Sequence, residues 1–522
     1  MAVKSVYNSS TAYNSANPLS ALLNKKAEDY TRADILRAVK YFGIEFLTFH
    51  YLGIDGRMRS LKLPFADLED AERILAMGER ADGSSLFQGL IDSAVSDIYI
   101  VPRYSSIFIN PFNNKSLDFM CRFVDSRGSF AMFSPDGILA GTAKQFQEST
   151  GHELWAMGEL EFFLVYPQPH PFDIYPAERQ GGYHISEPFF KYEGVVNEII
   201  HVVQQVTGAV KYAHSEVGNI RNIVSSNPVL NGMEAEQYEL EFNTRPICEA
   251  ADNICLARWL IRSTAAKYGL LATFTPKLAE DAAGSGMHIH VELRSKGRNV
   301  MLSSDGTLSE ESLRLIGGLA RYAPTLSAFG NTQASSFLRL VPNQEAPTKI
   351  CWSYSNRSSL IRIPLGWNGV GDLSRMVNPQ EPAEYVCDGC RQTIELRSPD
   401  GSANIHLLMA GMATAVKWGL EHDEAMDIAM KCQVKGNVFS DAKAAAKLES
   451  LPQSCSACAD LLVKNRDMYE KDGHFPPYVI DYVVESLRRE KDKDLRSLLN
   501  SMSGNAKIVK ALEIMHRDLH RC

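Results

Sequence analysis

Residues 287–293 constrain the fold of this 522-residue chain more than any other stretch of it. Apolar side chains alternate there with His288, His290 and a glutamate. A period of two predicts a β-strand that buries one face and presents the polar side chains on the other. Gly284 and Gly286, just before it, allow a sharp turn or the close approach of a ligand. The stretch fits a ligand site, and a half-exposed strand with its polar face in water would have the same pattern.

Pairs of ionisable residues two positions apart recur in two more strand-like segments. Glu159 and Glu161 lie within the largely apolar run 154–166, and Glu395 and Arg397 follow an isoleucine. Carboxylates are rarely buried unless they pair with a cation or hold a metal ion. Three such segments predict that their charged faces meet in one cleft.

The composition is that of a globular protein without a nucleic-acid or membrane partner. Hydrophobic residues make up 45% and charged residues 22% of the chain, and the formal net charge is -8 with no basic cluster. No apolar stretch approaches the ~20 residues that cross a bilayer, and the first residues lack the apolar core of a signal peptide. We therefore expect a cytoplasmic protein.

The ten cysteines have no regular spacing, as expected of reduced thiols. Cys387 with Cys390 and Cys455 with Cys458 have the spacing of half a zinc site each, but the pairs are far apart and the second lies in a helical pattern. Ordinary thiols are the better interpretation.

The chain is too long for one ordinary core, and its patterns divide it. Residues 1–26 are rich in Ser, Asn and Ala without periodicity, which predicts a disordered arm. Residues 27–125 predict a small β-rich domain that contains a helix at 31–42 and a hairpin around Asp55 and Gly56.

Residues 130–450 predict a large domain in which strands carry the charged pairs and helices lie between them, and residues 451–522 predict a helical C-terminal extension. The helices expected in the large domain are 135–150, 192–207, 251–269, 309–328 and 405–420.

Eight motifs in order resemble those of the glutamine synthetase superfamily. One short motif would be weak, but eight in the family's order, between about residue 38 and about residue 420, are specific. They are DGSS at 82–85, GELEFF at 158–163, GY at 182–183, ATFTPK at 272–277, GSGMHIH at 284–290, RLVPNQEAP at 339–347, NRSSLIRIP at 356–364 and ELRSPD at 395–400.

The resemblance implies an α+β fold with a small N-terminal β-grasp domain and a large catalytic domain built on a curved antiparallel sheet flanked by helices. The family forms stacked rings of identical subunits, and each active site lies between the small domain of one subunit and the large domain of its neighbour. The implied reaction is the ATP-dependent ligation of glutamate and ammonia through a γ-glutamyl phosphate, which gives glutamine, ADP and phosphate.

The resemblance also implies two divalent metal ions per site, Mg²⁺ or Mn²⁺, which prefer oxygen ligands with an occasional imidazole. A non-catalytic relative should have lost at least one ligand. Those assigned are Glu161, Glu216 and Glu239 for one ion and Glu159, His288 and Glu395 for the other.

The same motifs assign residues to the substrates, and the sets overlap. Asp82 would remove a proton from ammonium, and Glu345 would close a flap that keeps water from the acyl phosphate. The assignments are Arg357, Arg362 and His290 for ATP, with Arg357 also catalytic; Glu161, Gly284, His288, Arg339, Glu345 and Arg397 for the amino-acid substrate; and Asp82, Ser85, Tyr183 and Glu216 for ammonia.

Departures from the family pattern leave the acceptor open. Ala283 stands where an asparagine usually contacts the amino group of the substrate, and Glu292 and Thr393 replace a serine and an arginine near the nucleotide. Residues 218–235 and 377–390 are insertions expected beside the metal site. Three interpretations therefore stand: a glutamine synthetase, a γ-glutamyl ligase for a polyamine or other amine, and a non-catalytic ring-forming relative.

Overall fold

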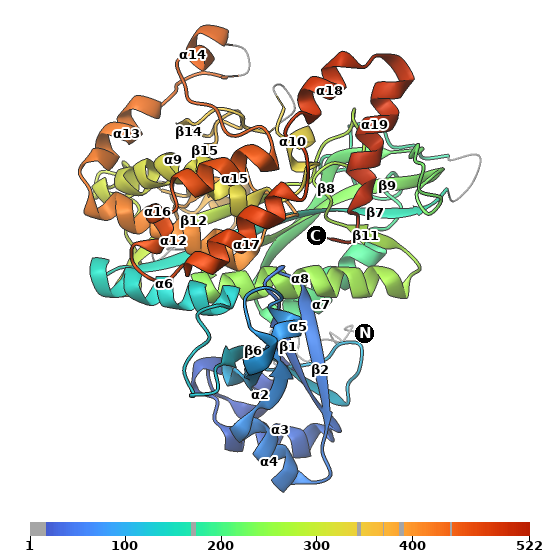
Figure 1. Ribbon diagram of the computed structural model, residues 1–522, viewed down its shortest axis with the longest axis vertical. Coiled ribbons are helices and arrows are strands. Elements are labelled where there is room, and N and C mark those ends of the chain that lie inside the picture. The colour runs from blue at the N-terminus through green and yellow to red at the C-terminus, as the bar shows by residue number, and fades with distance from the viewer. Residues whose placement is uncertain are drawn as a thin grey trace.

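The computed structural model describes residues 17–168, 174–341, 346–368, 370–385, 391–438 and 441–521. Figure 1 shows a small N-terminal domain, in blue, below a larger domain, with the long helices α6 (Pro135–Thr150) and α8 (Ile247–Lys267) lying across the boundary between them.

The small domain is a sheet with the helices α3 and α4 at its lower end in Figure 1. Its strands have the order β2-β1-β6-β4-β3, in which β1 runs parallel to β6, and Leu47, Phe49 and Phe119 are buried between the layers. Its main elements are α3 (Arg32–Phe42), β1 (Phe46–Leu52), β2 (Met58–Pro64), α4 (Leu68–Met77), β3 (Glu79–Asp82), α5 (Gly83–Leu86), β4 (Asp97–Pro102), β5 (Phe108–Ile109) and β6 (Ser116–Val124).

Capping and turn residues explain where the first helix and the first hairpin of this domain begin and end. Thr31 and Asp34 form a capping box at the beginning of α3, and Gly43 ends the helix with a φ of 61°. Gly56, with a φ of 73°, turns the chain between β1 and β2 as the Asp-Gly pair predicts.

Residues 17–26 are not disordered, so that prediction is wrong for this part of the arm. Asn17 caps helix α2 (Pro18–Leu23) by accepting a hydrogen bond from the backbone N–H of Leu19, and Leu19 and Leu23 are buried in the small domain. The polar composition of the arm conceals a short capped helix with two apolar side chains on one face. Residues 1–16 lie outside the described part of the chain.

The large domain contains a sheet in the order β14-β15-β16-β12-β7-β9-β8. Within this sheet, the pairings among the described strands are antiparallel apart from β14 with β15, so the predicted antiparallel sheet has one parallel pair. Its strands are β7 (Glu153–Pro167), β8 (Val210–Ile220), β9 (Met233–Phe242), β10 (Arg245–Pro246), β11 (Leu271–Thr273), β12 (Met287–Ser295), β13 (Arg298–Asn299), β14 (Trp352–Tyr354), β15 (Ile361–Ile363) and β16 (Ile394–Leu396).

The helices predicted for the large domain are present, and most of their ends agree within a few residues. Glycines let two of them pack closely: a Cβ added to Gly318 would lie 2.2 Å from the carbonyl oxygen of Ala415. Besides α6 and α8, the helices are α7 (Glu193–Thr207), α9 (Glu310–Gly330), α10 (Ser336–Arg339), α11 (Leu373–Val377), α12 (Ile405–Glu421), α13 (Glu424–Cys432) and α14 (Ala442–Ala446).

The C-terminal segment packs back onto the large domain, and residue 450 is no boundary in the packing. Cys455, Cys458 and Ile480 belong to the main core, and burial raises the pKa of both thiols. Cys387 and Cys390 lie outside the described residues. The helices of this segment are α15 (Cys455–Lys464), α16 (Asp467–Glu470), α17 (Pro477–Arg488), α18 (Leu495–Ser501) and α19 (Gly504–Arg517).

A buried ionic network joins the two domains. Asp252 in α8 accepts hydrogen bonds from Arg103 and Arg122 of the small domain, the second at 2.8 Å, and lies 3.0 Å from Nε2 of His406 in α12. Burial opposes the ionised carboxylate, but the two guanidinium groups and the imidazole hold the pKa of Asp252 far below its usual value. The same contact, acting against burial, raises the pKa of His406 to about 9.

Within the described residues, every helix is either too short or too polar to cross a lipid bilayer.

Candidate active site

A cleft of about 780 Å³ opens over the charged face of the large sheet. Most of the predicted site residues line it, and the strands β7, β8, β9, β12, β15 and β16 supply many of them. They are Glu159, Glu161, Tyr183, Glu216, Glu239, Gly284, His288, His290, Arg339, Arg357, Arg362, Glu395 and Arg397.

Strand register brings these side chains to one face. His288 in β12 lies opposite Glu159 in β7, and Glu161 lies opposite Glu239 in β9. On its other side β12 pairs with β16, where His290 lies opposite Glu395. Residues directly opposite in antiparallel strands point to the same face, so the ionisable pairs of separate segments form one cluster.

One half of the cluster alternates imidazoles and carboxylates. Nδ1 of His288 and Nε2 of His290 lie 2.8 and 2.9 Å from the two carboxylate oxygens of Glu159. Burial opposes the charge on Glu159, but the imidazoles of His290 and His288 outweigh it and lower the pKa of that carboxyl. Nη1 of Arg362 and Nε of Arg397 donate to Glu395 at 2.6 and 3.0 Å.

The other half is rich in carboxylates. Glu161 accepts hydrogen bonds from the backbone N–H of Gly286 at 2.9 Å and from Nε2 of Gln237 at 3.0 Å. Burial and the nearby Glu216 carboxylate raise the pKa of Glu161 to about 8, and burial and the neighbouring glutamates also raise that of Glu239. Carboxylates held close together in a buried site become favourable when a cation joins them, so this donor set fits divalent ions.

Among the described residues, three groups offer potential metal ligands, and the ligand atoms inside each group lie within 4.8 Å of one another. They are Glu159 with His290 and Glu395, His214 with Glu216 and Glu239, and Glu159 with Glu239 and Glu241.

These sets differ in part from the sequence assignment. His290 takes the place of His288 in the first set, and His214 takes the place of Glu161 in the second. Sequence reasoning misses His214 and Glu241, although each stands two positions from an assigned glutamate, the spacing shared by Glu159 and Glu161.

Two further arginines, Arg339 and Arg357, also line the cleft. Arg339 is buried and donates from Nη1 to the carbonyl oxygen of Ser398 at 3.0 Å. It lies so close to Gly284 that a Cβ there would come within 2.8 Å of the Arg339 Cγ, so only glycine fits. Arg357 lies over the ring of Tyr183, with its Cζ 5.8 Å from the ring centre.

The ammonia-binding set is not gathered within one chain. Asp82 ends β3 in the small domain, and its carboxylate accepts hydrogen bonds from the backbone N–H of Ser84 and from the hydroxyl of Ser85. These contacts, that of Ser85 first, lower the pKa of Asp82 to about 2. Asp82 and Ser85 do not line the cleft to which Tyr183 and Glu216 belong. Glu345 lies outside the described residues.

The departures from the family pattern also have places in the site. Ala283 lines the cleft, and its backbone N–H donates to the side chain of Gln180 at 2.7 Å. Thr393 hydrogen-bonds His290 Nδ1 at 2.9 Å, and Glu292 accepts from Arg294, whose guanidinium lies 3.5 Å from the ring centre of Trp155. Of the insertions 218–235 and 377–390, no described residue lines the cleft.

Two family models match the chain, the glutamine synthetase catalytic domain over residues 133–499 and the glutamine synthetase β-grasp domain over residues 43–126. The chain is 29% identical over 401 residues to a glutamine synthetase of Thermus thermophilus, which covers 75% of this chain and 80% of that protein. It is also 29% identical over 435 residues to a glutamine synthetase of Pyrococcus horikoshii, covering 82% and 86%.

Solved structures share the fold. A GmaS complex with ADP superposes with a TM-score of 0.70 at 19% identity, covering 92% of this chain and 99% of that chain. The cryo-EM structure of Plasmodium falciparum glutamine synthetase has a TM-score of 0.70 at 19% identity, covering 91% and 98%.

Proposed function

The chain belongs to the glutamine synthetase family, whose members are ATP-dependent ligases, and we propose that it joins glutamate to ammonia to give glutamine, ADP and phosphate. The observation that carries the proposal is the single cleft in which buried carboxylates and imidazoles face Arg339, Arg357, Arg362 and Arg397. Phosphoryl transfer between two anions requires that concentration of fixed charge.

The donor set supports binding of two divalent ions, Mg²⁺ or Mn²⁺, by glutamates of both halves together with His288. His214 and His290 each belong to a group of close ligand atoms that also contains two of these glutamates. When bound, such ions neutralise phosphate charge and polarise the phosphoryl group.

The arginines would orient the two reacting anions. Arg357 and Arg362 would hold the phosphates of ATP, while Arg339 and Arg397 would hold carboxylate oxygens of glutamate. In the first step the bond between the γ-phosphorus and the bridging oxygen of ATP breaks, and a new bond forms to an oxygen of the glutamate side chain. ADP leaves, and the glutamate carboxyl becomes an acyl phosphate.

In the second step the lone pair of ammonia attacks the acyl carbon, phosphate leaves with the bonding electrons, and the new amide nitrogen gives up one proton, for which we assign Glu345 as acceptor. Ammonium must first lose a proton, and we assign that role to Asp82. Because Asp82 does not line the cleft of its own chain, the proposal requires the small domain of a neighbouring subunit to supply it. The protein would therefore work as a homo-oligomer with shared sites, as in stacked rings.

A second candidate is a γ-glutamyl ligase for a larger amine. Ala283 has no side-chain group to contact the amino group of an amino acid, and it leaves space where the family usually has asparagine. The aromatic side chains of Tyr183 and Tyr212 line the same cleft and are exposed, so they could cover the alkyl part of an amine.

A coupled phosphate-release assay separates these functions. The protein is supplied with glutamate, ATP and Mg²⁺ and then with ammonia, monoalkylamines or diamines in turn, and Glu161→Gln serves as the inactive control. Release with ammonia supports the first proposal, and release only with larger amines supports the second. No release with any amine contradicts both.

A further inference from the structure

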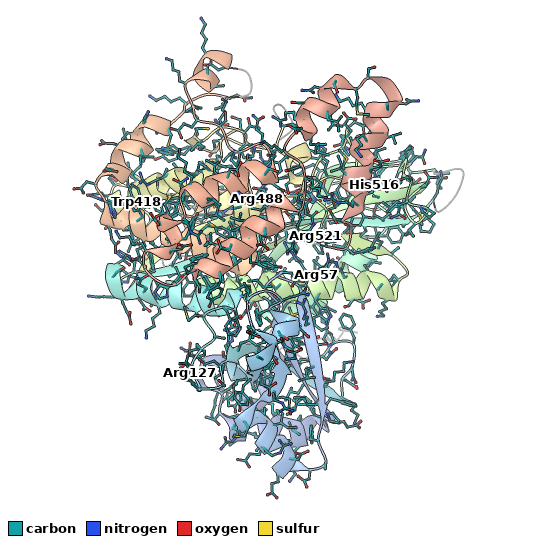
Figure 2. All side chains as sticks on the ribbon, in the orientation of Figure 1. Arg57, Arg127, Trp418, Arg488, His516 and Arg521 are labelled. Atoms are coloured by element: carbon teal, nitrogen blue, oxygen red, sulfur yellow. The ribbon has the colours of Figure 1, made fainter. Side chains whose placement is uncertain are left out.

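The C-terminal helix α19 contacts the large domain close to the cleft through one buried histidine. Nε2 of His516 lies 2.8 Å from the carbonyl oxygen of Leu278, and Nδ1 lies 2.8 Å from the hydroxyl of Ser225. Figure 2 labels His516 where the C-terminal segment crosses the green strands of the sheet. A carbonyl only accepts, so Nε2 carries the proton and Nδ1 accepts from Ser225. Burial lowers the pKa of His516, which favours this neutral form.

His516 thereby ties an insertion to a loop of the family core. Ser225 belongs to the 218–235 insertion, and its hydroxyl also accepts from the backbone N–H of Asn227 at 3.0 Å. Leu278 belongs to the loop between β11 and β12. Apolar side chains from the insertion, the loop and the C-terminus share one buried cluster, to which Ile223, Leu278 and Leu519 belong.

Two threonines, at the end of β11 and in the loop after it, add to the contact between this loop and the C-terminal segment. The hydroxyl of Thr273 donates to the carbonyl oxygen of Leu519 at 2.9 Å, and that of Thr275 donates to Met515 at 3.2 Å. The C-terminal carbonyls at the end of a helix need such donors, so these contacts satisfy both partners.

The C-terminal segment also contacts α10, the helix that carries the cleft residue Arg339. Leu338 of α10 packs against the cluster that contains Leu512 and Met515. Glu490 is buried, accepts from the backbone N–H of Ala334 at 3.0 Å and pairs with Arg517 and Arg521. Ala334, just before α10, is therefore tied through Glu490 to the two arginines near the C-terminus.

The braced loop leads directly to the cleft. The N–H of Ser285 donates to the carbonyl oxygen of Pro276 at 3.0 Å, and Nζ of the buried Lys277 donates to Ala282 at 2.6 Å. This closed loop carries Gly284, whose Cα faces the Arg339 side chain, and the carbonyl of Gly284 accepts from the same Gln237 amide that binds Glu161. A shift of the loop or of α10 would change the space between them.

We infer that α19 is a brace that positions the amino-acid end of the cleft, and that His516 is a positioning residue for glutamate. The inference rests on the proposed function in assigning Gly284 and Arg339 to that substrate. It also gives the 218–235 insertion a role: its described residues do not line the cleft but support the loop that does.

The test compares three full-length variants. His516→Ala removes both hydrogen bonds and should raise the KM for glutamate about tenfold while the KM for ATP stays within about twofold, because a displaced contact affects only the substrate it holds. His516→Gln should restore a KM for glutamate near the wild-type value, since its amide can donate to Leu278 and accept from Ser225. His520→Ala is the matched control, because His520 is an exposed histidine in the same segment.

Equal rises in both KM values, or no change in either, would overturn the inference. If His516→Ala fails to fold, Ser225→Ala removes one hydroxyl alone and should raise the KM for glutamate about threefold with the same selectivity. Absence of that rise would count against the brace.

Amide hydrogen exchange separates this inference from the proposed reaction. Without any substrate, peptides covering residues 276–285 should exchange faster in His516→Ala than in the wild type, while peptides from β12 should not. If the wild-type protein fails to turn over glutamate, the proposed function is refuted, but the exchange comparison still tests the brace because it needs no substrate. Unchanged exchange in residues 276–285 would overturn the brace.

Discussion

Replacing Asp252 by asparagine tests whether the buried ionic network holds the two domains together. Asn has nearly the same shape as Asp, so the change removes the charge and leaves the packing intact. Arg103 and His406 would then lose their anion, and Arg122 would keep only its longer contact of 3.5 Å with Asp136. Removing one partner of a buried pair costs about 3–5 kcal/mol, and we expect Asp252→Asn to lower the free energy of unfolding by that amount near pH 6.

The loss should depend on pH with a sign set by His406. Its pKa is about 9 in the folded protein and 6.5 when unperturbed, so the contact with Asp252 stabilises the fold fully below pH 6.5 and is lost as the pH rises through 9. The difference between the two pKa values of His406 corresponds to about 3 kcal/mol of stability. The pKa of Asp252 is lowered, so its own contribution is present above about pH 4 and lost in acid. The effect of Asp252→Asn should therefore be largest between about pH 4 and 6.5 and smaller by up to about 3 kcal/mol at pH 10.

The measurement is urea unfolding followed by tryptophan fluorescence at pH 6 and pH 10. Asp460→Asn is the control, because the Asp460 carboxylate pairs with Arg488 on the surface and should change the free energy of unfolding by less than about 0.5 kcal/mol. A loss below about 1 kcal/mol for Asp252→Asn at pH 6, or equal losses at the two pH values, would refute the reasoning.

Three more predictions concern the site. Asp82→Ala should lower kcat for amide formation about 100-fold or more with ADP affinity unchanged in calorimetry, and lost ADP binding would show that Asp82 has another role. Coexpression of Asp82→Ala with Glu161→Gln should recover about a quarter of wild-type phosphate release, because randomly mixed subunits rebuild some intact shared sites; no recovery would contradict sharing. Glu239→Gln should weaken Mn²⁺ binding about tenfold or more in a titration, since it removes one anionic ligand, and an unchanged affinity would exclude Glu239 as a ligand.

Alternation alone predicts the strand β12 and the face on which its two imidazoles lie, because the side-chain period of a strand fixes the face. It does not predict the partners of these imidazoles. His288 meets Glu159 from a segment 129 residues away in the sequence, and only the pairing of β12 with β7 decides that contact. The family motifs predict the candidate residues, whereas the register between paired strands determines which of them are in contact.

Other features had weaker signals or none. His214 shares the two-residue spacing of the assigned pairs, so the pattern was present and a search confined to family motifs passes over it. Asp252 gives no such sign, because its partners come from the small domain and from α12. The role of the C-terminal segment is equally hidden, since a helical pattern says nothing about which loop His516 will contact.

Glutamate labelled with ¹⁸O in its side-chain carboxylate tests the central claim most directly. If the protein activates glutamate as an acyl phosphate, one carboxylate oxygen must leave with the phosphate, whichever amine is the acceptor. The phosphate released during turnover with ATP, Mg²⁺ and a productive amine should therefore carry one ¹⁸O atom by mass spectrometry. Turnover that releases only unlabelled phosphate would contradict the account.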